Sequence, residues 1–492
     1  MSALVVGNLG NSDLTADGER PRRPRPEGEL LWQQFEAHSF ALPLIEPCLA
    51  QLLAEGVNIT RVVLFYTDQP ETEETMTADR FGVRLRDKDT VWYAQIAARL
   101  LHERFDARVG SVELRRVERG NGEAINPSLY DEAFDAYSDL IARAYLPDDT
   151  SCFVLMAGGI PACNSALQLH ALGAYADRCR FVYQPEGGHP YELRVGAQLQ
   201  ATFRRATALD ALARHDFATA LHSVETLERP DPALLALLRY ACYREAFDFV
   251  RARVALGEGL RAASGRFRIF LDTLKPDLEQ LVERTDSAAL LLEVYASARI
   301  TWDNQRYADF LGRIFRFQEA TLRHIVETRL ELPTDMGATV QAPNLARYQA
   351  GIAASPALQA HLDAQRIDER PLRYADGPNR TVMSAMLSFL AAGGVRADGR
   401  PYLEKAELGR FGELRRRLNK LENLAQLRNQ SIIAHGFAGV SREELDRAYG
   451  GEAVGIMQDL AKVLELLGLG QAASPFDRIA EAAAESLRRA AR

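Results

Sequence analysis

The sequence has few cysteines and lacks the spacings typical of metal sites. Its five cysteines lie far apart without a CxxC pair, and its nine histidines show no HExxH spacing. We therefore expect neither a disulfide framework nor a bound metal, and we expect a reducing cytoplasm as the compartment. The cysteines are Cys48, Cys152, Cys163, Cys179 and Cys242.

Long apolar runs and an excess of positive charge are also absent. No stretch approaches the roughly 20 apolar residues of a membrane-spanning helix. The start MSALVVGNLGNSDL has no basic region and no small-residue cleavage site, so we expect neither a membrane span nor a signal peptide. The net charge of −8 argues against a protein that coats nucleic acid nonspecifically. This net charge is still compatible with a local basic pocket that binds one phosphate.

The chain of 492 residues is too long for a single hydrophobic core. Its first part alternates short apolar runs with amphipathic stretches, which predicts α/β architecture with a doubly wound, mostly parallel, Rossmann-like sheet. From about residue 196 only helical patterns remain, without a fixed-period repeat. We expect an α/β domain at 1–195, a helical linker domain at 196–290 and an all-α domain at 291–492.

The expected elements of the α/β part follow from these patterns. Strands are predicted at Ala3–Val6, Arg61–Tyr66, Val112–Val117, Cys152–Met156 and Arg180–Tyr183. Helices are predicted at Trp32–Ala54 with breaks near Pro43 and Pro47, at Val91–Phe105, at Ser128–Ala144 and after Gly159. The segment Gly18–Gly28, GERPRRPRPEG, predicts a flexible loop. It is either a solvated loop or a mobile basic lid over an anionic ligand.

Two glycine-containing turns follow predicted strands, and the second also opens a helix. In doubly wound folds, ligands bind at the carboxyl ends of the strands, and backbone N–H groups at a helix start favour phosphates. Thr67, directly after another strand, is a further candidate. The candidate ligand-binding residues are Gly7, Asn8, Leu9, Gly10, Asn11, Ser12, Thr67, Gly158, Gly159, Ile160, Pro161 and Asn164.

The stretch from Glu413 to Phe437 is the most informative part of the sequence. Leucine and alanine recur there at spacings of four, three and four, which predicts a buried seam along one helix. The next seam positions are Arg428, Ile432 and His435, so two ionisable side chains fall where apolar ones are expected. Gly436 is expected to end this helix, and Ser441 with Glu444 to open the next one as a capping box.

Arg428 and His435 carry a possible chemistry. On one helix they would lie two turns, or roughly 10.5 Å, apart on the same face. In RNA cleavage the ribose 2′-hydroxyl attacks the adjacent phosphorus, a histidine transfers the proton, and an arginine stabilises the phosphorane charge without a metal. Asn429 could orient the imidazole or a phosphate oxygen. The alternative is a histidine satisfied within the core.

At this stretch the sequence also resembles a family. The stretch is similar to the Arg-x(4–6)-His motif of HEPN ribonucleases. Arg428 is followed by Asn429, six residues separate Arg428 from His435, and Gly436-Phe437 come next. More narrowly they resemble the CARF–HEPN effectors of type III CRISPR systems, the Csm-six and Csx-one group. The two glycine turns resemble the ligand-contacting turns of CARF domains, and ALARHDFATALHSV resembles the helical hairpin that follows them. The resemblance covers nearly the whole chain in architecture, with roughly 30 residues at motif level.

The resemblance implies a CARF domain at 1–195, a HEPN ribonuclease domain at 291–492 and a homodimer. It implies activation by cyclic tetra- or hexa-adenylate and metal-independent cleavage of single-stranded RNA, leaving 2′,3′-cyclic phosphate and 5′-hydroxyl ends. It implies no cofactor, no membrane and no stable DNA binding. Some members have Thr and Lys in the second turn, where this chain has Ile160 and Ala162. The ring size and any degradation of the activator therefore stay open.

Two other functions are compatible with these patterns. The chain could be a nucleotide-sensing regulator with a degenerate, non-catalytic HEPN domain, although the presence of Arg428, Asn429 and His435 counts against this. It could also be a structural all-α assembly protein with an unrelated nucleotide-binding domain, which leaves the polar break in the seam unexplained.

Overall fold

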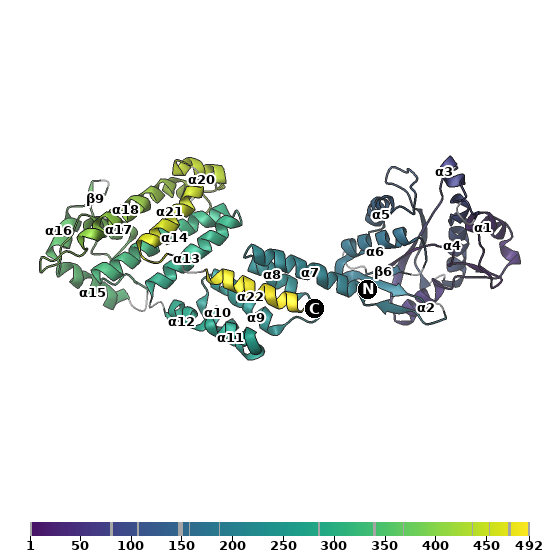
Figure 1. Cartoon of the computed structure of the whole chain (residues 1–492), viewed down its shortest axis with the longest axis horizontal. Coiled ribbons are helices and arrows are strands. Elements are labelled where there is room, and N and C mark those ends of the chain that lie inside the picture. Colours follow the sequence, from purple (N-terminus) through teal and green to yellow (C-terminus); the bar gives the residue numbers. More distant parts are fainter. Residues whose placement is uncertain are drawn as a thin grey trace. The chain divides into compact units, whose positions relative to one another are not determined.

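The computed structural model describes residues 2–490 except 79–81, 106–107, 146–150, 157, 186, 284–285, 338–340, 368, 435, 452 and 471–473. The chain forms two compact units, Met1–Phe203 and Arg204–Arg492 (Figure 1). Within the described residues, no helix is both long enough and apolar enough to cross a membrane.

The first unit is built on a six-stranded sheet with the order β5-β4-β1-β6-β7-β8. The first five of these strands are parallel, and β8 pairs with β7 in the antiparallel sense. The expected doubly wound, mostly parallel sheet is confirmed, and each predicted strand is present within two or three residues. The strands are β1 (Ser2–Asn8), β4 (Asn58–Tyr66), β5 (Val112–Arg116), β6 (Ser151–Leu155), β7 (Cys179–Tyr183) and β8 (Tyr191–Leu193).

Helices cover both faces of this sheet, as Figure 1 shows for α4 and α6. Along β1, Ala3 and Val5 belong to the core beneath α2 and α4, whereas Leu4 and Val6 belong to the core beneath α5 and α6. Burial on both faces explains the nearly continuous apolar runs of the strands. The helical elements of this unit are α1 (Pro24–Gln33), η1 (Phe35–Ala37), α2 (Glu46–Ala54), α3 (Glu73–Met76), η2 (Arg86–Lys88), α4 (Val91–Phe105), α5 (Tyr130–Ala144), α6 (Pro161–Tyr175) and η4 (Ala176–Arg178).

Two predictions for the N-terminal segment were wrong. The segment Gly18–Gly28 is not a loop throughout, because α1 begins at Pro24, where proline supplies a helical φ and lacks only an N–H that would be unpaired anyway. The helix expected at Trp32–Ala54, with breaks near Pro43 and Pro47, is instead two separate helices. Between α1 and α2 the chain forms η1 and β3 (Phe40–Ala41), which pairs with β2 (Thr15–Ala16).

Among its described residues, the second unit is helical apart from one short hairpin, β9 (Arg366–Ile367) with β10 (Arg370–Pro371). Its helices are α7 (Val195–Ala213), which begins in the first unit, α8 (Phe217–Glu225), α9 (Pro232–Glu245), α10 (Phe249–Ala262), α11 (Gly265–Thr273), α12 (Lys275–Glu283), α13 (Ser287–Asp303), α14 (Tyr307–Ile325), η5 (Val326–Leu330), α15 (Gln341–Ala353), α16 (Pro356–Asp363), α17 (Arg380–Ala391), α18 (Lys405–Leu421), η6 (Glu422–Leu424), α19 (Ala425–Gln430), α20 (Arg442–Tyr449), α21 (Val454–Leu466) and α22 (Pro475–Arg489).

Two hydrophobic cores lie within this helical unit. One spans residues 291–464, and the other spans residues 208–300 together with α22. The last helix therefore packs back against α9, where Phe476 and Leu487 are buried. A fully buried ion pair, Arg244–Glu293, joins α9 to α13 with contacts of 2.7 and 2.9 Å. The division into domains at 195 and 290 stays a prediction.

Three connections between helices share one geometry. His215, Phe247 and Gln305 each have a positive φ near 60° and follow the end of a helix. The N–H of the next residue in each case bonds back five residues, which closes a Schellman motif around the last carbonyls. After the first two, Asp216 and Asp248 cap the following helix. The hairpin expected at ALARHDFATALHSV is the first of these connections.

Candidate functional site

A pocket of about 490 Å³ opens at the carboxyl ends of four parallel strands. Residues that follow β1, β4, β5 and β6 line it, which is the position where doubly wound folds bind ligands. The lining includes eight of the twelve candidate ligand-binding residues. These are Asn8, Leu9, Gly10, Asn11, Thr67, Gly159, Ile160 and Pro161.

The other four candidates lie outside the lining. Gly7 is still within β1, where its Cα faces Leu155, so the first turn begins later than expected. Ser12 and Gly158 are next to lining residues without taking part in the lining. Asn164 lies on α6 and accepts a hydrogen bond from Asn8, which lines the pocket.

The two glycine turns touch each other. A Cβ on Gly10 would lie 2.2 Å from the backbone nitrogen of Gly159, so no side chain fits there. Gly159 has a φ of +90°, and a Cβ on it would lie 2.6 Å from the Cβ of Asn8. Position 10 requires glycine because the other turn approaches it closely. Position 159 requires glycine for the same reason and also because of its positive φ.

A buried polar network fixes these turns. The Asn8 side chain is 5% exposed; its Nδ2 donates to Asn164 Oδ1 at 2.7 Å, and its Oδ1 accepts from the hydroxyl of Tyr137. The network links β1, α6 and α5. Because each polar group of Asn8 is paired, burial costs little and the side chain has a single orientation.

Asp13, which the sequence patterns did not single out, lies beneath both turns. Its Oδ2 accepts a hydrogen bond from the Gly10 N–H at 2.6 Å, and a Cβ on Gly158 would collide with its carboxyl group. The side chain is 1% exposed. Burial raises the pKa of Asp13 to about 7, although the bond from Gly10 and the charge of Arg20 both lower it. A carboxyl group that titrates near neutrality therefore supports the pocket.

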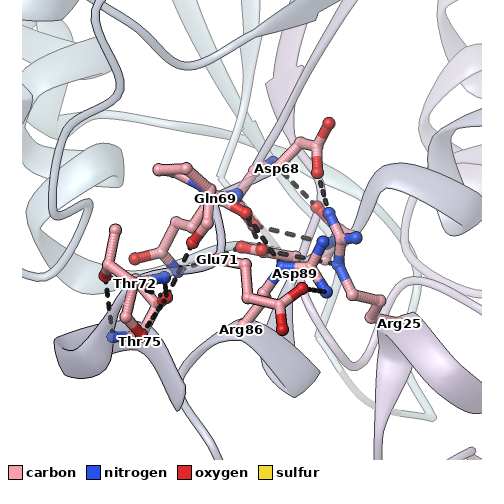
Figure 2. Close-up of polar contacts among 11 residues, drawn as sticks. Arg25, Asp68, Gln69, Glu71, Thr72, Thr75, Arg86 and Asp89 are labelled. Atoms are coloured by element: carbon pink, nitrogen blue, oxygen red, sulfur yellow. Dashed lines mark hydrogen bonds and ion pairs between the residues drawn. The ribbon is translucent and has the colours of Figure 1, made fainter.

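The Pro/Arg segment contacts residues that follow β4 and residues that precede α4 (Figure 2). Arg25 on α1 forms ion pairs with Asp68 and with Asp89, the latter at 3.7 Å. Asp89 in turn accepts hydrogen bonds from the backbone N–H of Gln69 at 2.7 Å and from its side-chain amide at 3.1 Å. Through this contact Arg22 and Pro24 reach the pocket lining. The segment thus contributes Arg22 to the pocket lining, and the lid interpretation stays a prediction.

The candidate catalytic stretch differs from the single helix that its pattern predicted. The helix α18 ends at Leu421, a 3-10 turn follows, and α19 ends at Gln430. The single helix expected to run from Glu413 to Gly436 is therefore wrong, whereas the separation of two turns between Arg428 and His435 stays a prediction. His435 lies outside the described residues. Ile432, placed on the buried seam by the pattern, is 68% exposed.

Backbone contacts explain why α19 stops where it does. Ser431 is extended and fully buried, and its hydroxyl donates to the carbonyl of Arg428 at 2.8 Å. The N–H of Ala438 then donates to the carbonyl of Gln430 at 3.0 Å. Gly436 packs on the same peptide, because a Cβ on it would lie 1.9 Å from the Gln430 oxygen. Gly436 is required by this close approach and does not end a helix. The capping box of Ser441 and Glu444 is confirmed at the start of α20.

Arg428 and Asn429 lie together at the end of α19. The Nε and Nη2 of Arg428 donate to Asn429 Oδ1 at 3.2 and 2.9 Å, and the guanidinium lies 4.4 Å from the centre of the Phe315 ring. Burial and the nearby charge of Arg380 lower the pKa of Arg428. Its guanidinium remains protonated at neutral pH, since an arginine starts far above it.

Arg380 is a second arginine at this site that sequence reasoning missed. It is the first residue of α17, and its guanidinium lies 5.6 Å from the centre of the same Phe315 ring. It forms an ion pair with Glu422 at 3.2 Å and donates to Gln318 Oε1 at 3.0 Å. No local pattern marks it, because only the packing of α14, α17 and η6 brings it beside Arg428.

Two further properties of the chain bear on its chemistry. Phe437, next to the candidate motif, is 96% exposed, so a large apolar side chain faces solvent there.

Among the residues that the structure describes, no group of three or more His, Cys, Asp and Glu side chains could hold a metal ion.

Comparisons with known proteins complete this description. No protein-family model matches the sequence, and no curated protein matches it. Among solved structures, the chain is similar to Enterococcus italicus Csm6 bound to cyclic hexa-2′-fluoro-hexa-dAMP, with 12% identity, 99% of each chain covered and a TM-score of 0.47.

Proposed function

We propose that this chain is a cytoplasmic endoribonuclease that a cyclic oligoadenylate activates, and that Arg428, Asn429 and His435 form its active site. The observation that carries this proposal is the arrangement at the end of α19. There Arg428 is half-buried on Phe315, paired with Asn429 and free of any carboxylate ion pair among the described residues. A guanidinium in this state has donors available for the non-bridging oxygens of a phosphodiester.

The proposed reaction is a transesterification. The ribose 2′-oxygen forms a bond to phosphorus while the bond from phosphorus to the 5′-oxygen breaks. His435 moves the proton between these oxygens, and Arg428 stabilises the charge that develops on the phosphorane. The products carry a 2′,3′-cyclic phosphate and a 5′-hydroxyl. The substrate is single-stranded RNA, whose backbone can adopt the in-line geometry.

The pocket of the first unit is the proposed activator site. Residues of both glycine turns line it, α6 begins beside it, and Arg22 adds a positive charge. These groups suit the phosphates of a nucleotide ring. In a homodimer, two such pockets related by a two-fold axis would bind one ring of matching symmetry, a cyclic tetra- or hexa-adenylate. The exposed Phe437 offers apolar surface to a second copy.

An RNA cleavage assay in excess EDTA, across a panel of cyclic oligoadenylates, tests the proposal. We expect cleavage by the wild type with one ring size and no loss on chelation. His435→Ala and Arg428→Ala should each reduce the rate at least roughly a hundredfold, while His222→Ala, an exposed histidine on α8, serves as the control. Near wild-type turnover by His435→Ala would refute the catalytic assignment. Activator binding without RNA cleavage by the wild type would favour a nucleotide-sensing regulator.

A further inference from the structure

Two positive charges share one aromatic ring beside the proposed catalytic motif. The guanidinium carbons of Arg428 and Arg380 lie 4.4 and 5.6 Å from the centre of the Phe315 ring, so they are at most about 10 Å apart. Two successive phosphodiesters can accept hydrogen bonds from both groups at this separation, and a single one can do so where the groups lie closer than this bound.

The charges at this position are not balanced. Among the described residues, Glu422 is the carboxylate that pairs with Arg380, and none pairs with Arg428. The two arginines repel each other enough for Arg380 to lower the pKa of Arg428. Holding two partly desolvated cations beside one carboxylate costs free energy unless an anion joins them.

The protein scaffold nevertheless holds Arg380 in place. Gln318 on α14 is 2% exposed, and its Nε2 donates to the Leu418 carbonyl at 3.0 Å and to Glu422 at 2.7 Å. These two bonds fix the amide so that its Oε1 faces Arg380 and accepts from it. A buried amide with all its groups paired gives the guanidinium a defined position.

We propose that Arg380 is a second phosphate-binding arginine of the RNA-cleaving site, positioned by Gln318 and Glu422. This inference rests on the proposed function and assigns to Arg380 a contact with a non-bridging phosphate oxygen, in the ground state and in the phosphorane. In this proposal Arg380 takes no part in proton transfer. Phe315 separates the two guanidiniums from the core and keeps both facing the substrate.

The chain offers a matched control for this proposal. Arg329 lies 5.6 Å from the centre of the Phe411 ring and 3.1 Å from Glu407, and it is 36% exposed. Arg380 has nearly the same surroundings, with 5.6 Å to its ring, 3.2 Å to its carboxylate and 32% exposure. Both alanine variants lose a ring contact and an ion pair, whereas Arg380→Ala also loses the bond to Gln318, and only Arg380 lies beside Arg428.

The test compares Arg380→Ala, Arg380→Lys and Arg329→Ala in steady-state RNA cleavage with saturating activator. We expect Arg380→Ala to lower kcat/KM at least roughly thirtyfold and to reduce the salt slope of log KM by about 0.7, the value for one phosphate contact on single strands. Arg380→Lys should recover part of the rate, since it keeps the charge without the bidentate geometry. Arg329→Ala should stay within roughly twofold of the wild type.

Thermal melting separates this role from a structural one. If Arg380→Ala melts well below the wild type, it is replaced by Arg380→Gln, whose side chain can still donate to Glu422. The expected changes in rate and salt slope are then the same. A folded variant at position 380 with wild-type rate and wild-type salt slope would overturn the inference and leave the proposed function intact. A wild type that cleaves no RNA with any activator would instead overturn the proposed function.

Discussion

The buried carboxyl group of Asp13 should make the stability of this protein fall as the pH rises through neutrality. Its folded-state pKa of about 7 lies above the ordinary value of 3.8. A group with a raised folded pKa binds its proton more tightly in the folded state, so its stabilising contribution is complete below 3.8 and is lost as the pH rises to about 7. This direction is opposite to that of an acidic residue in an ion pair.

The size of the effect follows from the difference of about three pKa units. Between pH 5 and pH 8 the free energy of unfolding should fall by roughly 2–3 kcal/mol through this group alone, at 1.36 kcal/mol for each unit. In Asp13→Asn the loss should disappear. The asparagine oxygen can still accept from the Gly10 N–H, and the buried charge is gone.

Urea unfolding of the full chain from pH 5 to pH 8, followed by a signal from the first unit, measures this difference. Asp17→Asn is the control, because Asp17 is exposed and hydrogen bonds from the Ser39 N–H and His38 lower its pKa. The contribution of the Asp17 carboxylate is complete above pH 5. In a His38→Gln background, which removes its histidine partner, that variant should therefore differ from its parent by a constant amount. A difference between wild type and Asp13→Asn that does not grow with pH would refute the reasoning.

Three further substitutions have defined outcomes. Gly159→Glu should abolish binding of a cyclic oligoadenylate in calorimetry and abolish activated cleavage with it, since it strains a φ of +90° and adds a negative charge at the pocket; normal binding would place the ligand elsewhere. Gly436→Ala should lower RNA cleavage at least roughly tenfold with little change in melting temperature, because its Cβ displaces the segment bonded to Gln430; an unchanged rate would mean that this segment does not position the motif. Glu293→Ala should lower the free energy of unfolding in urea by about 3–5 kcal/mol, because it leaves Arg244 buried without its carboxylate partner. The control Glu225→Ala breaks an exposed pair with Arg239 and should lower it by at most about 1 kcal/mol. Equal losses would contradict this prediction.

The sheet could be predicted from the sequence because its strands are buried on both faces. Such strands appear as continuous apolar runs, and β1, β4 and β6 were found for this reason. The strand β8 has no such run, since Tyr191 and Glu192 are exposed at the sheet edge. The prediction of a loop at Gly18–Gly28 was wrong because it took the prolines as helix breakers, whereas Pro24 is the first residue of a helix.

The candidate site could be predicted only where it depends on local sequence. The glycine turns and the Arg428-Asn429 pair were visible as patterns. The end of α19 was not, because apolar spacing continues through Ile432 while the bonds of Ser431 stop the helix. Arg380 acquires its role from residues far along the chain, and Asp13 acquires part of its role from the distant Gly158. A single sequence does not reveal such contacts.

The return of α22 to α9 constrains how this protein is made. The core around Leu237 is complete only when Phe476 and Ile479 reach it, yet the rest of that core ends near Leu281 and Ile300. During translation at about 5–20 residues per second, the exposed apolar face of α9 waits roughly 10 to 40 seconds for its final helix. Throughout that interval the nascent chain presents a surface that chaperones bind. Premature termination before residue 475 would leave the same surface permanently open to aggregation and proteolysis.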